Sequence, residues 1–144
     1  MRKIVWGVFA LFIIGCASGA VQLSQDMSPE ELMQRGQEAA DRNRYGVALR
    51  YYTEIRERFS SNMSMVCAAE YEIAHVHYKQ KKYDLAKDEL NALLARYDGS
   101  DAELLPPQFK RLCAIVLGRI DEKEQSQERV KNFFKNPFGT PKKS

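Results

Sequence analysis

The chain repeats its pattern of small and aromatic residues with a period of 38 residues, and this repeat restricts its possible architectures more than any other feature. The shift aligns these pairs: Gly36 with Ala74, Tyr45 with Tyr83, Ala48 with Ala86, Tyr52 with Leu90, Ile55 with Leu93, Arg58 with Arg96, and Phe59 with Tyr97. A small residue midway along one helix and an alanine early in the next let two antiparallel helices approach closely, while the tyrosine between them fills the remaining gap. The repeat therefore predicts an all-α fold built from two antiparallel helical hairpins.

The first hairpin has a clear start signal at Ser28. This serine is followed by Pro29 and, three residues on, by Glu31, which is the pattern of a capped helix with proline at its first position. Apolar residues then follow helical spacing up to Phe59, with an interruption beside Gly46. We expect two helices of about fourteen residues joined by a tight turn, within a domain spanning residues 28–135.

A third unit begins after the second hairpin but does not continue the pattern. Pro106 and Pro107 open a helix up to about Ile120, with an apolar face made of Phe109, Leu112, Cys113, Val116, Leu117 and Ile120. The following stretch is polar, and Gln125 stands where the repeat would have an alanine. The expectation is a partial third repeat closed by a separate, degenerate capping helix with Val130, Phe133 and Phe134, and then a tail over residues 136–144.

This pattern of small and aromatic positions resembles the tetratricopeptide repeat, in which helical hairpins stack into a solenoid. The usual repeat is 34 residues long, so the period of 38 implies a longer turn near Ser60 to Met63. The longer form is similar to the repeats of periplasmic lipoproteins, including those of outer-membrane β-barrel assembly. The resemblance implies two full repeats plus the partial third.

The N-terminus predicts export and lipidation. Arg2 and Lys3 precede an apolar run of eleven residues, which is too short to cross a bilayer as a helix and is typical of a signal peptide. The run ends in Gly15 and Cys16, which resembles the bacterial lipobox, so residues 1–15 are expected to be removed and Cys16 to be acylated. An ordinary signal peptide cut near residues 17–20, or an uncleaved anchor, remains the alternative.

The segment that follows predicts where the chain resides. Residues 16–27 lack helical periodicity and are expected to form a flexible tether between the lipid and the domain. Because Ala17 rather than aspartate follows the cysteine, the lipoprotein resemblance implies the periplasmic face of the outer membrane in a two-membrane envelope. In a single-membrane bacterium the same signal would place the domain on the cell surface.

Charge and residue spacing argue against several functional classes. The formal charge of +3 falls to +1 without Arg2 and Lys3, which gives no basis for nucleic-acid binding. His75 and His77 are two positions apart on an expected helix, so they point in different directions and cannot share a metal. No nucleophile and base pattern or glycine-rich phosphate loop is found in the sequence, which predicts a non-enzymatic protein without metal or cofactor.

Two cysteines fall within the expected domain. In repeat register, Cys67 and Cys113 are offset by seven positions on neighbouring helices, or roughly 10 Å along the axis. A disulfide needs Cα atoms within about 7 Å, so we expect buried free thiols, although a one-turn shift of the third unit would permit a bond.

The repeat resemblance also implies where a partner binds, because the first helices of such repeats line a concave face. The residues mapped to that face and expected to contact a partner are Met33, Gln37, Tyr71, His75, Tyr78, Lys79 and Lys110. The face lacks the lysine and asparagine set with which chaperone-tail readers hold a terminal carboxylate. Tyr71 and Tyr78 would suit an extended peptide or helix, and the alternative is that both only pack against neighbouring helices.

The expected function is thus a membrane-anchored, non-catalytic scaffold that binds a protein or peptide in the cell envelope. A narrower form of this expectation places the scaffold in an outer-membrane assembly complex. The alternative is a lipoprotein that delivers a ligand or substrate to an envelope transporter or wall enzyme. A closed apolar cavity would favour the alternative, and an open groove favours the scaffold.

Overall fold

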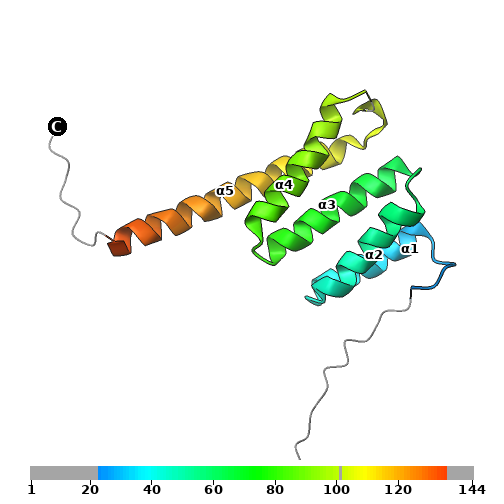
Figure 1. Cartoon of the computed structure of the whole chain (residues 1–144), viewed down its shortest axis with the longest axis horizontal. Helices are drawn as coiled ribbons and strands as arrows, with labels where there is room; N and C mark the ends of the chain where they lie inside the picture. The colour runs from blue at the N-terminus through cyan, green and yellow to red at the C-terminus, as the bar shows by residue number, and fades with distance from the viewer. Residues whose placement is uncertain (1–22, 101, 136–144) are drawn as a thin grey trace, which may run out of the picture.

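The computed structural model describes residues 23–100 and 102–135, and within these ranges the chain is helical and contains no β-strand. Its elements are α1 (Pro29–Asp41), α2 (Tyr45–Arg58), α3 (Met63–Lys79), α4 (Tyr83–Ala95), the short 3-10 helices η1 (Arg96–Asp98) and η2 (Ala102–Leu104), and α5 (Pro107–Lys135) (Figure 1). The all-α prediction is therefore confirmed. The expected signal peptide, Cys16 and the tail over 136–144 lie outside the described residues.

The two hairpins, α1 with α2 and α3 with α4, turn in the same way at positions 38 residues apart. Asn43 and Lys81 both adopt positive φ, at 57° and 62°. The amide after each of them donates to a carbonyl near the end of the preceding helix: Arg44 to Ala39 at 2.8 Å, and Lys82 to His77 at 3.0 Å. The hairpin register read from the sequence is thus reproduced by the backbone.

Polar side chains cap the first helix of each hairpin. The Glu31 amide donates to Ser28 Oγ at 3.2 Å, with Pro29 as the first helical residue, as the sequence predicted. The Met65 amide donates to Asn62 Oδ1 at 3.2 Å at the start of α3. These caps satisfy amides that lack helical partners, and they place the turn between the hairpins at residues 59–62.

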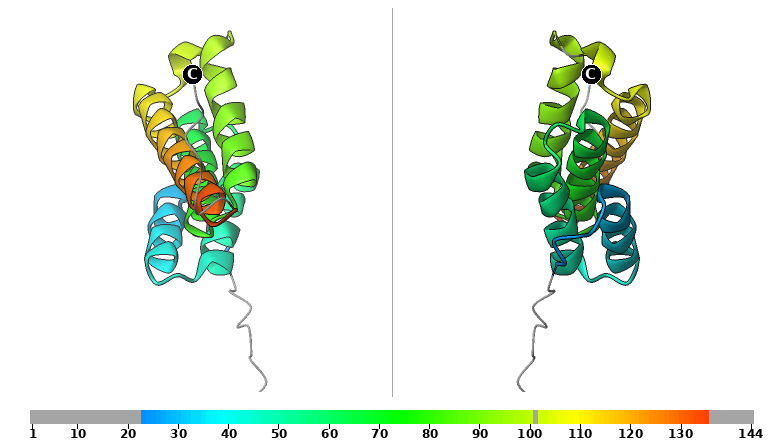
Figure 2. Two further views of the ribbon diagram at one scale, coloured as in Figure 1. Left: turned by 90° about the vertical axis from the view of Figure 1, so that its left-hand side faces the viewer. Right: turned by 90° about the vertical axis from the view of Figure 1, so that its right-hand side faces the viewer.

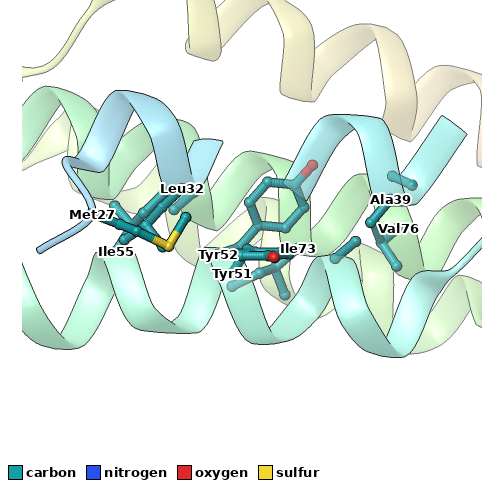
Figure 3. Close-up of a cluster of buried hydrophobic side chains, with 11 residues drawn as sticks. Met27, Leu32, Ala39, Tyr51, Tyr52, Ile55, Ile73 and Val76 are labelled. Atoms are coloured by element: carbon teal, nitrogen blue, oxygen red, sulfur yellow. The ribbon is translucent and has the colours of Figure 1, made fainter. Parts of the chain in front are cut away.

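Two buried clusters hold the helices together, and α3 contributes to both. Ala69, Ile73 and Val76 of α3 join a first core cluster with residues of α1 and α2 (Figure 3). A second core cluster packs the opposite side of α3 against α4 and α5: Cys67, Tyr71, Ala74, Ala86, Leu90, Leu93, Cys113, Val116 and Ile120. The body is therefore three layers of helix with α3 in the middle, as the end-on views show (Figure 2).

Gly36 of α1 packs directly against the ring of Tyr52 on α2. A Cβ atom built on it would lie 2.9 Å from both Cδ1 and Cζ of the Tyr52 ring, and closer still to Cε1. Tyr52 is fully buried and therefore has little room to withdraw. At the equivalent positions of the second hairpin, Ala74 and Leu90 belong to the second core cluster, so the larger residue of α3 goes with a smaller residue of α4.

Part of the expected tether belongs to the folded body. Met27 is buried in the first core cluster and Leu23 packs against it. The Arg58 guanidinium donates to the carbonyls of Ser24 and Met27, each at 3.2 Å, and also to that of Gln25. The folded unit thus begins at least five residues before Ser28, because an arginine of α2 satisfies the carbonyls of a segment that has no helical periodicity of its own.

The prediction of a separate capping helix after Ile120 is wrong. α5 runs without interruption from Pro107 to Lys135, and its C-terminal half projects from the body (Figure 1). The stretch from Asp121 to Gln127 is polar, but residues 121–135 contain neither glycine nor proline, so nothing in them ends a helix. Lys87 of α4 adds support, with its ammonium 3.2 Å from Asp121 and 2.9 Å from Glu124.

Candidate functional site

The first helices of the two hairpins are bridged by polar side chains on one face. Gln37 of α1 donates from Nε2 to Oε1 of Glu72 on α3 at 3.0 Å. One turn further along α1 and two turns further along α3, Lys79 Nζ lies 3.7 Å from Asp41. Gln37 and Asp41 are four residues apart on α1, and their partners Glu72 and Lys79 are seven residues apart on α3. Polar contacts therefore link the two helices at two levels.

Between these bridges lies an open cleft of about 230 Å³, here named the α1–α3 cleft. It is lined by Gln37, Ala40, Asp41, Tyr52, Glu72, His75 and Lys79. Tyr52 reaches it from α2, and its Oη is buried without a hydrogen-bond partner. Burial raises the pKa of Tyr52 well above its ordinary value, with smaller contributions from Glu72 and Asp41, so the hydroxyl remains a donor.

Glu72 is the most heavily engaged charge in the α1–α3 cleft. Burial would raise the pKa of its carboxyl, but interactions with His75 and Gln37, together with the charge of Lys79, outweigh burial and hold that pKa below its ordinary value. The Nδ1 atom of His75 lies 3.9 Å from the carboxylate. Glu72 is therefore ionised at neutral pH and supplies an acceptor at the middle of the cleft.

The structure brings together three of the residues expected to bind a partner and separates others. Gln37, His75 and Lys79 line the α1–α3 cleft. Met33 instead packs, partly buried, against the first core cluster. Lys110 lies beside η1, with Nζ 4.0 Å from Asp98 and 6.0 Å from the centre of the Tyr97 ring, so it is not part of the cleft.

The two tyrosines of α3 belong to a row of aromatic rings. Tyr71 stacks on His75 with centroids 5.7 Å apart, and His75 stacks on Tyr78 at 6.0 Å. The row ends against Phe109 of α5 and Tyr83 of α4. Tyr71 is only 8% exposed, and burial raises its pKa to about 12, with smaller effects from neighbouring groups. Tyr71 therefore packs the second core cluster, and the accessible part of the row is His75 with the edge of Tyr78.

A second cleft, which the sequence analysis missed, lies among α2, α3 and α4. It measures about 170 Å³ and is lined by Arg56, Glu70, Ile73, Glu89, Ala92, Leu93 and Arg96. Three of its charged side chains have partners, because Arg96 bridges to Glu70 and Glu89 lies 2.7 Å from Nδ1 of His77. The one sequence signal that could have indicated this cleft was the recurrence of arginine at Arg58 and Arg96. In each hairpin this arginine links the end of the second helix to another segment.

Cys67 and Cys113 are free thiols in the second core cluster, as the sequence predicted. Burial raises the pKa of both, to about 12 for Cys113, where Cys67 adds to the effect. The Sγ of Cys67 lies 3.4 Å from Oη of Tyr97. Because the thiolate is the reactive form, these side chains act as small apolar core residues at neutral pH.

The described residues were also compared with the requirements of a metal site and of a membrane-spanning helix. Within residues 23–100 and 102–135, no group of three histidine, cysteine or acidic side chains is arranged to hold a metal ion. No helix in the same ranges combines the length and hydropathy needed to cross a membrane.

Comparison with known proteins finds a relative of similar sequence. An uncharacterized protein of Treponema pallidum (strain Nichols) is 33% identical over 114 residues, which cover 79% of this chain. The chain spans somewhat less than half of that protein, 46% of its length. No known family profile matches the chain, and no solved structure matches it either.

Proposed function

We propose that this chain is a lipid-anchored, tetratricopeptide-repeat-like scaffold of a bacterial cell envelope that holds a protein or peptide partner in the α1–α3 cleft. The hairpin pair supports the repeat assignment, because Gly36 and Ala74, Ala48 and Ala86 occupy matching buried positions. Stacked hairpins of this kind expose the faces of their first helices, which are the surfaces that repeat proteins use for binding.

The observation that carries the proposal is the open, polar α1–α3 cleft, in which Gln37 and Glu72 meet across the two first helices. The exposed side chains of Gln37 and Lys79 supply donors there, and the ionised Glu72 supplies an acceptor. Backbone carbonyls of an extended peptide can accept from these donors, and its amides can donate to Glu72. The α1–α3 cleft holds about 230 Å³ and is open, whereas small-molecule sites usually enclose about 300–1,000 Å³, so the cleft favours a peptide over the ligand-delivery role.

The proposed anchor would keep the domain close to the membrane. Because Leu23 already contacts the body, only residues 17–22 separate it from Cys16. A segment of that length spans at most about 20 Å when fully extended. A partner in the α1–α3 cleft would thus be held near the membrane surface.

Substitution of Cys16 by alanine tests the anchor. We expect Cys16→Ala to abolish incorporation of labelled fatty acid and to leave an unprocessed precursor, because the acylated thiol is lost. Mass spectrometry of the N-terminus and labelling in cells measure both effects. Ser24→Ala is the matched control and should be labelled normally; full labelling of Cys16→Ala would contradict the lipoprotein assignment.

Site-specific photo-crosslinking tests the location of the partner. A photo-reactive phenylalanine analogue at Gln37 or Lys79 should give a discrete crosslinked product in intact cells, because both side chains line the α1–α3 cleft. The same analogue at Glu57, an exposed position of α2, is the matched control and should give none. A product from Glu57 but not from Gln37 or Lys79 would move the site to the opposite face.

Tyr52→Phe then tests the hydroxyl itself in the same assay. Since Tyr52 Oη has no partner within the described residues, its removal should leave the melting temperature unchanged or higher. Crosslinking from Gln37 should be unchanged, because Tyr52 Oη has no accessible surface that a partner could reach. Weakened crosslinking would show instead that the cleft opens far enough for a partner to use this hydroxyl.

A further inference from the structure

The projecting end of α5 exposes apolar side chains that the body does not cover. Every side chain from Gln125 to Lys135 is exposed. Val130, Phe133 and Phe134 are 53%, 64% and 75% exposed, and the two phenylalanine rings contact each other edge to face. Clustered exposed side chains of this size mark an interaction surface more often than scattered single ones do. We name residues 129–135 the α5 tip.

The α5 tip is also basic. It carries Arg129, Lys131 and Lys135 and contains no acidic residue. The sequence beyond it adds Lys142 and Lys143, again without an acidic residue, so residues 129–144 carry +5. Since the whole chain carries +3, residues 1–128 together carry −2. The positive charge is therefore concentrated at one end.

Charged and apolar side chains of the α5 tip occupy different sectors of the helix. At about 100° per residue, Val130, Phe133 and Phe134 fall within a sector roughly 100° wide. Arg129 lies on one side of this sector and Lys131 and Lys135 on the other. An apolar sector flanked on both sides by cations is the arrangement of helices that lie in the membrane interface.

We propose that the α5 tip docks on an anionic lipid surface, with Phe133 and Phe134 inserted among the headgroups and the three cations against lipid phosphates. Charge complementarity favours lipid over a second copy of the chain, because tip-to-tip pairing would place +3 against +3. Basic side chains beside an anionic membrane and apolar area in its interface both stabilise binding. The contact does not depend on the α1–α3 cleft or on acylation of Cys16.

Vesicle binding by the unlipidated chain from Ala17 to Ser144 tests this proposal. All contacts of the body described above lie within residues 23–135, so this chain retains them. It should co-sediment with vesicles of phosphatidylcholine plus phosphatidylglycerol, less in high salt, and not with phosphatidylcholine alone. Phe133→Ser with Phe134→Ser should lower partitioning roughly 30-fold, from lost apolar burial, and Lys135→Glu should lower it about five-fold or more.

Matched controls come from the same protein. Leu104→Ser removes an apolar side chain that is 68% exposed but lies outside the α5 tip. Lys123→Glu makes the same charge change as Lys135→Glu on an exposed residue of the same helix, nearer the body. Both controls should bind like the parent, and circular dichroism should show every variant folded.

Three outcomes would overturn the proposal. Equal binding to neutral and anionic vesicles would remove the role of charge, and equal losses in the controls would remove the role of the α5 tip. Self-association that is abolished by the Phe133 and Phe134 substitutions, without vesicle binding, would assign the surface to a second copy instead. Crosslinking from Gln37 is unaffected by any of these results, so the two proposals fail separately.

Discussion

Ala48→Trp and Ala86→Trp should each destabilise the protein by at least about 3 kcal/mol, the upper end of the range for overpacked cores. Both alanines are fully buried at the contact between the two helices of a hairpin. An indole cannot fit there unless the helices separate, and separation would uncover the side chains that pack around it. For a domain of this size, the melting temperature should fall by roughly 10 °C or more.

Ala114→Trp is the matched control for these substitutions. Ala114 is exposed on α5, so the same side chain should change the melting temperature little. Thermal unfolding followed by far-UV circular dichroism compares the three variants. A melting temperature for Ala48→Trp or Ala86→Trp within a degree or two of the parent would contradict the 38-residue register.

Gly36→Ala should also destabilise the protein, by about 1–3 kcal/mol, although alanine is the better helix former. The new methyl group would overlap the ring of Tyr52, which is fully buried and cannot swing into solvent. Gly118→Ala gives the opposite expectation. A Cβ atom there meets nothing within 4 Å, so this variant should gain about 0.5–1 kcal/mol from helix propensity alone. The midpoint urea concentration of unfolding should therefore fall for Gly36→Ala and rise for Gly118→Ala, relative to the parent.

A double variant identifies the cause of the Gly36 effect. Gly36→Ala with Tyr52→Leu gives the first hairpin the residue types that the second hairpin has at the equivalent positions Ala74 and Leu90. Tyr52→Leu alone should destabilise through lost packing, but the double variant should be more stable than the sum of the two single changes. Additive losses would show that the clash with Tyr52 is not the source of the Gly36→Ala effect.

The two hairpins could be predicted because their information is local and repeated. Ser28 and Pro29 predict the start of the first helix. The 38-residue offset predicts equivalent turns in the two hairpins, and both turns have a residue with positive φ, Asn43 and Lys81. The third unit could not be predicted by the same reasoning. A polar run near Gln125 ends the pattern of burial, but only a residue such as proline or glycine ends the helix, so α5 continues as far as Lys135.

The candidate site was predictable only to the level of a helix face. Helical spacing and the repeat resemblance place Gln37, His75 and Lys79 on one surface, and the three do line the α1–α3 cleft. The same reasoning cannot tell Tyr71, which packs in the core, from His75, which is accessible, because both lie on that face and differ only in what the neighbouring helix covers. Phe109 of α5 makes that difference.

The sequence by itself thus determined the helical class, the hairpin boundaries, the small residues at the helix contacts and the burial of both thiols, since each depends on spacing within about forty residues. Tertiary structure alone decided which polar groups meet. Arg58 holds residues 24–27 against the body, and Tyr52 reaches the α1–α3 cleft from α2 without a partner for its hydroxyl. The packing of the helices also leaves Phe133 and Phe134 exposed. These outcomes depend on distances between side chains on different helices. Such distances are set by how the helices pack, and residue spacing along the chain does not give them.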